Sequence, residues 1–211
     1  MENIFIFSKD HIMILIYFSI FVYFCPILTK NLLPYSYIVE KILCWLLILE
    51  IIFEQFSLIS MGGYNVCTSL PITASRVCAF IGIAILYFKQ YQWFNIFFSW
   101  SLVCSIEDII FFPNIVFRYP NVLYFLNIFS KALLIYINVY LVEVRKFKVT
   151  KSAIYQNLFI CLIYFSFIFL LNTFTYSNYN YSFSSSNLIS ILIFLILTTL
   201  IYIFKLFIDK Y

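Results

Sequence analysis

The sequence predicts an all-α protein, a polytopic bundle of about seven transmembrane helices. Of its 211 residues, 64% are hydrophobic and only 10% are charged, whereas charged residues make up about a quarter of an ordinary soluble domain. Apolar stretches of about 17 to 25 residues, long enough to cross a hydrocarbon core about 30 Å thick, recur along the whole chain. The expected spans are residues 12–28, 42–59, 70–88, 93–112, 122–142, 154–171 and 188–207.

The expected spans differ in how clearly they begin. The first has no strongly basic leader and no small-x-small cleavage site, only Cys25-Pro26, so we expect it to remain as a span rather than to be removed as a signal peptide. The third has a clear start, because Ser69 can cap a first turn and Pro71 lies near the first helical position. The others are identified by their apolar length alone. Segments between spans are at most roughly twenty residues long, so we expect residues 1–211 to form a single transmembrane domain without a soluble domain.

The basic residues predict the orientation of the spans, because Lys and Arg in short loops resist translocation. One side of the expected bundle carries Lys9 and Arg118 only. The other side carries Lys30, Lys41, Lys89, Arg145, Lys146, Lys148, Lys151, Lys205 and Lys210. This asymmetry predicts a multi-pass protein of the cell membrane with its N-terminus outside and its C-terminus in the cytoplasm. Such a topology requires an odd number of spans, and seven satisfies it.

Composition also limits the partners and cofactors. The basic residues are distributed among loops, so nucleic-acid binding is not expected, and membrane lipids are the expected partners. The cluster at 145–151 is either an ordinary topology signal or a contact for anionic headgroups. The six cysteines form no CxxC pair and the only histidine is His11, so we expect neither a disulfide framework nor a metal site, and no cofactor. The sequence does not indicate an oligomeric state.

Six ionisable residues fall inside the expected spans, where charges are costly and usually face a cavity or a partner. They are Glu50, Glu54, Arg76, Glu107, Asp108 and Lys131. At about 1.5 Å of rise per residue, Glu54, Arg76 and Glu107 lie at one depth in the outer half of the bilayer. Glu50 and Glu54 are four residues apart and share a helix face. We therefore predict an outward-facing polar chamber that binds a lipid or small polar ligand. Its expected residues are Glu50, Glu54, Thr73, Ser75, Arg76, Glu107 and Lys131.

A purely structural interpretation remains open. Glu54–Arg76 and Glu107–Lys131 could be neutralising pairs that only specify helix packing. Four acids against two bases leave two carboxylates without partners, which favours a hydrated or ligand-binding site. Asp108 is the expected exception, because it follows Glu107 on the opposite side of the helix, close enough to the outer boundary to be partly hydrated.

One stretch resembles a known family. The run Gly63-Tyr64-Asn65-Val66-Cys67-Thr68-Ser69-Leu70-Pro71-Ile72 is similar to the Gly/Trp loop and Leu-Pro-Leu-His-Leu-Cys helix start that mark the YwaF-type bacterial integral membrane proteins. Further landmarks follow in the family's order, over about residues 45–185. They are an acid on the preceding helix (Glu50 or Glu54), an aromatic-Trp (Trp100), a turn (Phe112-Pro113-Asn114), a Phe-Pro-x-Phe-Arg-Phe-like stretch (residues 119–124) and a late Asn-Tyr element (Asn178-Tyr179-Asn180-Tyr181).

The resemblance implies only a limited function. Most bacterial members have no established activity, whereas distant eukaryotic relatives are regarded as membrane acyltransferases acting on phospholipids. The family's His falls at Thr73, its Cys falls at Ser75, and a second His falls near Lys131. Acyl transfer needs a nucleophile and a base within hydrogen-bond reach, so these replacements favour a protein without enzymatic activity. Ser75 with Glu54 or Lys131 is the substitute pair that would keep an enzyme possible.

Three functions stay open from the sequence. The first is a non-catalytic membrane protein that binds a lipid or small polar ligand. The second is a phospholipid acyltransferase with Ser75, Glu54, Glu107 and Lys131 as its polar centre. The third is a transporter or a substrate-binding transport component, in which the carboxylates would carry protons or bind a cation. Inverted repeats, which mark many transporters, are not evident, because the polar residues concentrate in the second to fifth spans.

Overall fold

Every regular element of the described chain is helical, which confirms the all-α prediction. The computed structural model describes residues 9–110, 122–179 and 188–208. Arg118, Lys210, the landmarks at 112–121 and Asn180-Tyr181 lie outside the described residues. The elements are α1 (Lys9–Lys30), η1 (Leu33–Tyr35), α2 (Ser36–Ser60), α3 (Val66–Ser69), α4 (Ala74–Leu86), η2 (Tyr91–Trp93), α5 (Phe94–Ile110), α6 (Val122–Glu143), α7 (Ala153–Thr175) and α8 (Leu188–Ile208).

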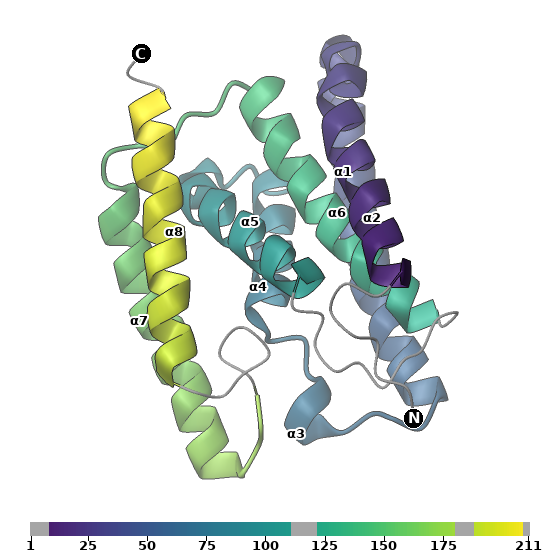
Figure 1. The fold of residues 1–211 in the computed structure, drawn as a ribbon, viewed down its shortest axis with the longest axis vertical. Coiled ribbons are helices and arrows are strands. Elements are labelled where there is room, and N and C mark those ends of the chain that lie inside the picture. Colours follow the sequence, from purple (N-terminus) through teal and green to yellow (C-terminus); the bar gives the residue numbers. More distant parts are fainter. Residues whose placement is uncertain (1–8, 111–121, 180–187, 209–211) are drawn as a thin grey trace.

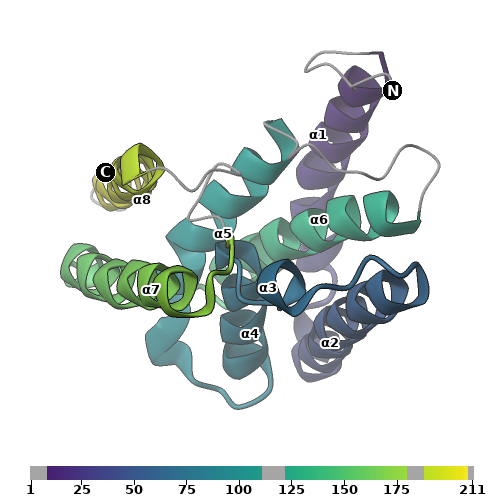
Figure 2. The ribbon, with the colours of Figure 1, turned by 90° about the horizontal axis from the view of Figure 1, so that it is seen from below.

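The helices form a bundle around α5 and α6 (Figure 1). α5 packs against α4, α6, α7 and α8, whereas α6 packs against α1, α2, α4 and α5. Figure 2, seen from below, shows α7 and α8 on one side of α5, and α6 between α1 and α2. α2, α4, α5 and α6 therefore make the centre of the bundle, and these are the helices that carry the ionisable residues of the expected spans.

The outer surfaces of the bundle are apolar. Side chains such as Leu162, Phe204 and Phe56 are about two-thirds exposed, which is favourable in lipid and costly in water. Four helical segments of the described chain are long and apolar enough to cross a membrane. They are Ser36–Ser60, Leu126–Glu143, Ala153–Thr175 and Ile189–Ile208. The chain is thus a membrane protein, as its composition predicts.

The start of the third expected span was predicted wrongly. α4 begins at Ala74, and Thr73 occupies its N-cap position without a side-chain cap. Pro71 disfavours the helical region for the residue before it, and Leu70 is accordingly extended, with φ −63° and ψ 142°. Ser69 instead ends the short α3, where its hydroxyl accepts a hydrogen bond from the Asn65 amide at 3.1 Å.

The resulting extended segment, residues 70–73, is stabilised by a distant tyrosine. The hydroxyl of Tyr164 on α7 donates to the Ile72 carbonyl at 3.1 Å. Non-helical backbone is tolerated at membrane depth where protein groups satisfy it. This bond therefore allows α4 to begin below the end of the bundle.

α4 approaches its neighbours closely at a glycine. A Cβ at Gly82 would lie 3.0 Å from Cε2 of Phe97 on α5 and 3.2 Å from Cδ1 of Leu47 on α2. A methyl at this position would require the Phe97 or Leu47 side chain to shift by a few tenths of an ångström. Gly82 thus allows α2, α4 and α5 to approach closely.

Candidate functional site

Arg76 lies in the first turn of α4 and is the centre of the predicted site. The side chain is buried, with 4% of the residue exposed. Nη2 lies 2.6 Å from Oε1 of Glu54, and Nη1 contacts Glu50 Oε2. The predicted Glu54–Arg76 pair is confirmed, and Glu50 joins it because two residues four apart on α2 face the same neighbour.

A second cation lies beside this group. Lys131 on α6 is 3% exposed. Its Nζ lies 2.6 Å from Oδ2 of Asp108 on α5 and donates to the Ser75 hydroxyl at 2.7 Å. Two serines link the cations. Ser75, which accepts from Lys131, precedes Arg76 on α4. Ser130, which accepts from Arg76 Nη1 at 3.2 Å, precedes Lys131 on α6.

These seven residues are called the charged cluster below. They are Glu50, Glu54, Ser75, Arg76, Asp108, Ser130 and Lys131. Five of them were predicted from the sequence. Thr73, also predicted, is exposed at the N-cap of α4, and Glu107 is buried on α5.

Asp108 is the main difference from the expected arrangement. We expected it outside the site, on the opposite side of the helix from Glu107. Its carboxylate instead pairs with Lys131, while 23% of the side chain remains exposed. Adjacent helix residues point about 100° apart, so the facing position could not be chosen from spacing without knowing how α5 is rotated toward α6.

The charged cluster carries more acid than base, and two of its acids are partly exposed. Three carboxylates share two cations, and Glu54 and Asp108 are the members with about a quarter of the side chain exposed. Within the described part of the chain, Glu50 Oε1 is buried and has no hydrogen-bond partner. A buried acceptor without a donor is costly, so this oxygen is a place where a ligand group with an N–H or O–H would be stabilised.

Polar bonds also tie the last two helices to α5. Trp100 is fully buried and donates to Asn157 Oδ1 at 2.8 Å, and Asn157 donates to Thr198 Oγ1 at 2.9 Å. Tyr202 on α8 donates to the Asn95 carbonyl at 2.6 Å. The sequence analysis predicted no polar site in these two helices, because their Asn, Thr and Tyr side chains carry no charge.

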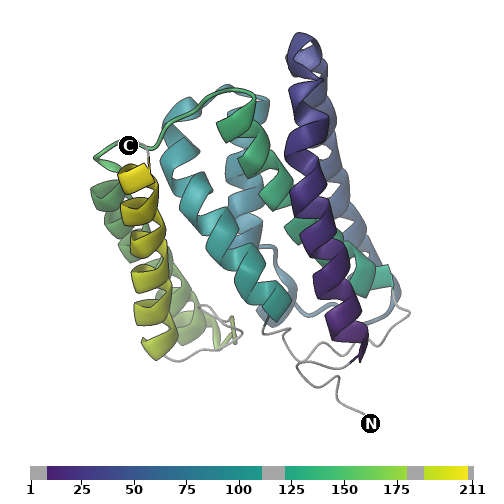
Figure 3. The same ribbon diagram turned by 45° about the horizontal axis from the view of Figure 1, so that its top comes forward.

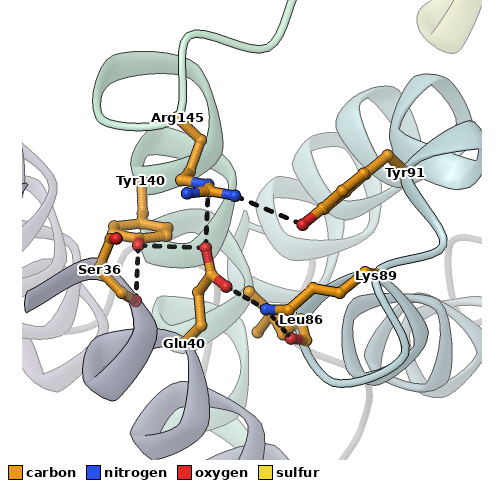
Figure 4. Close-up of polar contacts among 7 residues, drawn as sticks. All are labelled: Ser36, Glu40, Leu86, Lys89, Tyr91, Tyr140 and Arg145. Carbon is orange, nitrogen blue, oxygen red and sulfur yellow. Dashed lines mark hydrogen bonds and ion pairs between the residues drawn. The ribbon is translucent and has the colours of Figure 1, made fainter.

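A second ion cluster, called the Glu40 cluster below, lies at the other end of α2 and was not predicted from the sequence. Glu40 is 3% exposed and contacts Lys89. Its Oε1 lies 3.0 Å from Arg145 Nε and accepts from the Tyr140 hydroxyl at 3.4 Å. Figure 4 shows Lys89 and Arg145 converging on Glu40 from two different elements. We expected Lys89 to be a topology signal and Arg145 to be either a topology signal or a contact for anionic headgroups. The one available hint of a cluster was Glu40, an acid two residues before the expected span.

The described residues offer little for a metal ion or a disulfide. No group of three His, Cys, Asp or Glu side chains in residues 9–110, 122–179 and 188–208 is arranged to hold a metal. Cys44, Cys67, Cys78, Cys104 and Cys161 are free thiols. The chemistry of the site is therefore that of carboxylates, one guanidinium, one ammonium and hydroxyls.

Comparison with known proteins gives one match. Residues 6–208 match the sequence profile of the TMEM164 family, a family of membrane proteins. No curated protein sequence and no solved structure matches the chain.

Proposed function

We propose a function for this chain on one premise: it belongs to the TMEM164 family of membrane proteins. The chain is a multi-pass protein of the cell membrane with seven spans, similar to the YwaF-type proteins. Its charged cluster binds a lipid or small polar ligand in the outer half of the bilayer, without catalysing a reaction on it.

The arrangement of the helix ends supports this topology. The Lys9 end of α1 and the Ile208 end of α8 lie at opposite ends of the bundle (Figure 3), as an odd number of spans requires. The Glu40 cluster joins Lys89 and Arg145 in one place, so basic residues from two loops lie on one side. In this topology that side is cytoplasmic, and the charged cluster lies toward the outside.

The observation that carries the proposed binding function is the state of Glu50. One of its carboxylate oxygens contacts Arg76, whereas Oε1 is buried without a partner among the described residues. A purely structural ion pair would satisfy both oxygens. The unsatisfied oxygen and the excess of carboxylates favour a ligand that donates hydrogen bonds, such as an amine or hydroxyl of a lipid headgroup or small solute.

Two partly exposed acids belong to the same cluster as this oxygen. Glu54 is 24% exposed and shares Arg76 with Glu50, whereas Asp108 is 23% exposed and shares Lys131 with Ser75. A ligand bound at Glu54 would be separated from Glu50 only by their shared partner, Arg76. The same acids would attract a positively charged group from the outer headgroup region.

Native mass spectrometry of the purified full chain in mild detergent tests this function. Wild-type protein should retain a lipid or polar solute, and Glu50→Gln should reduce the retained fraction at least tenfold. Glu143→Gln is the matched control, because it removes one acid whose side chain is 44% exposed at the end of α6. It should retain the ligand.

Loss of the ligand from both variants, or its absence from wild-type protein, contradicts the proposal. Thermal unfolding of each variant identifies any that fails to fold. Cation-dependent uptake of a solute into vesicles that contain the wild-type protein would instead support a transporter.

One observation favours phospholipid acyl transfer as a second candidate. Lys131 Nζ lies 2.7 Å from Ser75 Oγ, where the resemblance places a family Cys, with a family His near Lys131. In such a reaction Ser75 Oγ would attack a phospholipid acyl carbonyl and release a lysophospholipid that takes the proton. The hydroxyl of a second lipid would then attack the acyl-serine ester, form a new ester with the acyl group and return its proton to Ser75 Oγ.

The direction of the hydrogen bonds makes acyl transfer the weaker candidate. Lys131 donates both to Ser75 and to Asp108, and an ammonium has no lone pair with which to take the serine proton. A phospholipid with a labelled acyl chain tests it. The label should transfer to wild-type protein but not to Ser75→Ala, whereas Ser130→Ala, which removes the neighbouring hydroxyl, should keep it. Absence of transfer to wild-type protein rejects this candidate.

A further inference from the structure

A pocket of about 470 Å³ lies away from the charged cluster. One side of it is lined from η2 and the start of α5, by Tyr91, Gln92, Phe94 and Asn95. The other side is lined from the α6–α7 connection and the start of α7, by residues between 146 and 156. It is called the loop pocket below. Lys131 lies twelve residues before the end of α6 at Glu143, which corresponds to about 18 Å of helix rise, and Lys146 follows that end, so the two sites are separate.

The floor of the loop pocket is a fixed network of hydrogen bonds. Asn95 is 6% exposed and donates to Thr150 Oγ1 at 2.9 Å and to Gln156 Oε1 at 2.6 Å. The Asn95 side-chain oxygen, Oδ1, accepts from the Thr150 backbone amide at 3.2 Å, and the Thr150 and Ser152 hydroxyls share a hydrogen bond of 2.9 Å. Both N–H groups of the Asn95 amide are donated within the network. The free donors of the floor are therefore the N–H groups of the Gln156 amide and the one hydroxyl proton that the Thr150–Ser152 pair leaves over.

The rim of the loop pocket carries cations with little neutralisation. Lys146 is 73% exposed, and its nearest acid, Glu143, is 3.9 Å away. No ion pair of Lys148 occurs within the residues that the structure covers. Arg145 reaches the pocket through Tyr91, to whose hydroxyl Nη2 donates at 3.4 Å. The positive charge at the rim is thus available to an anion.

The backbone of Lys146 adds a second indication. Lys146 has φ +57°, a left-handed conformation that usually requires glycine at the end of a helix. The Phe147 amide bonds the Leu141 carbonyl at 3.0 Å, which completes the helix end. A glycine at position 146 would adopt this backbone conformation with less strain. The lysine found there instead places a cationic side chain at the pocket.

Aromatic side chains form the remaining wall. Phe147 packs edge-on against Tyr91 and Phe94, with ring centroids 5.0 Å and 5.2 Å apart. The loop pocket therefore combines an apolar wall, a donor floor and a cationic rim at the helix ends that we place in the cytoplasm.

We propose that the loop pocket binds a phosphate group, with Lys146 and Lys148 neutralising its charge and the Asn95–Thr150–Gln156 floor and Ser152 orienting its oxygens. Phosphate oxygens accept several hydrogen bonds and favour paired cations. The aromatic wall and the position at the helix ends indicate an anionic phospholipid headgroup as the source, and a soluble phosphate is the other source with the same chemistry. This site is independent of the ligand proposed for the charged cluster.

Binding to the full chain in detergent tests the proposal, with dioctanoyl phosphatidic acid, dioctanoyl phosphatidylcholine and inorganic phosphate as probes. Phosphatidic acid should bind at least tenfold more tightly than phosphatidylcholine. Lys146→Gln/Lys148→Gln should weaken binding of phosphatidic acid at least tenfold, and Ser152→Ala, which keeps all charges, about threefold to fivefold. Lys30→Gln/Lys151→Gln is the matched control, because it removes two exposed lysines of the expected cytoplasmic side that do not line the pocket. It should change binding less than twofold.

The source of the phosphate follows from competition. Displacement of phosphatidic acid by millimolar inorganic phosphate supports a soluble phosphate as the ligand, whereas retention supports the lipid headgroup. Equal weakening by the two double variants would overturn the proposal, because the loop would then act only through its total charge. Absence of binding by both phosphatidic acid and inorganic phosphate would also overturn it.

Discussion

Nη2 of Arg76 lies 2.6 Å from Oε1 of Glu54, across the contact between α4 and α2. The second nitrogen of the same guanidinium contacts Glu50, one turn earlier on α2. A planar guanidinium can bridge two carboxylates in this way, whereas the single ammonium of a lysine cannot match the fork geometry. Arg76 therefore holds two helices together and also positions the Glu50 carboxylate of the proposed binding site.

Removing either member of the Glu54–Arg76 pair should destabilise the protein in detergent. Arg76→Gln should cost about 3–5 kcal/mol, because it leaves a buried Glu50 without its cation. Glu54→Gln should cost about 1–2 kcal/mol, because the partly exposed Glu54 is less desolvated. The exchange Glu54→Arg/Arg76→Glu should restore part of the loss. Equal thermal unfolding temperatures for wild type and all three variants would show that the pair contributes nothing to stability.

Gly82→Ala should destabilise the centre of the bundle. The added Cβ would lie 3.0 Å from Phe97 and 3.2 Å from Leu47, and overpacking of this kind costs about 1–3 kcal/mol. Phe97→Leu in the same chain should recover part of the loss, since it shortens the group that the methyl meets. Gly63→Ala is the control, because its Cβ would meet only Leu58 O at 3.9 Å. Thermal unfolding distinguishes steric conflict from helix propensity, which would favour alanine at Gly82.

The link between α5 and the last two helices should depend on Asn157. Asn157→Leu would leave the buried Trp100 N–H without its acceptor and should cost about 1–3 kcal/mol. Thr199→Val is a suitable control, because among the described residues the Thr199 hydroxyl bonds only the Leu195 carbonyl of its own helix, at 2.7 Å. If Thr199→Val destabilised the protein as much as Asn157→Leu, the loss would come from reduced polarity within α7 and α8 and not from the missing bond to Trp100. The measurement is thermal unfolding, monitored by tryptophan fluorescence.

Hydrophobic length predicted a helix for every expected span, because the apolar runs are long and lipid tolerates few polar side chains. It did not locate the start of α4. The Ser69 and Pro71 signals were real but local, and they produced α3 and an extended segment whose Ile72 carbonyl is satisfied by Tyr164, 92 residues away. A sequence pattern within one segment cannot include such a distant donor.

The sequence also predicted part of the candidate site. Buried charges identified Glu50, Glu54, Arg76 and Lys131, since each is too costly to leave without a partner. The choice between Glu107 and Asp108 depended on the rotation of α5, which is set by packing. Glu40 was missed because its partners, Lys89 and Arg145, lie just beyond the helix ends, where basic residues also have an ordinary topological explanation.

Tyr179 should attach the connection after α7 to α3 in a pH-dependent way. Tyr179 is 3% exposed, its hydroxyl contacts the Val66 carbonyl, and Asn172 Oδ1 accepts from its amide at 2.9 Å. Burial raises the pKa of Tyr179 above its ordinary value of 10.0, so the folded state favours the protonated hydroxyl. Its contribution to stability should be complete below about pH 10, the pKa in the unfolded chain, and should be lost as the pH rises through the higher folded value.

Comparison of wild type with Tyr179→Phe across pH measures this contribution. The variant should be less stable by about 0.5–1.5 kcal/mol near neutral pH, and this difference should shrink once the pH exceeds about 10. Tyr176→Phe controls for loss of a tyrosine hydroxyl, because Tyr176 is 93% exposed and should match wild type throughout. A difference that stays constant up to about pH 11 would show that folding does not raise the pKa of Tyr179. Equal stability of Tyr179→Phe and wild type near neutral pH would show that the attachment to α3 does not depend on the Val66 hydrogen bond.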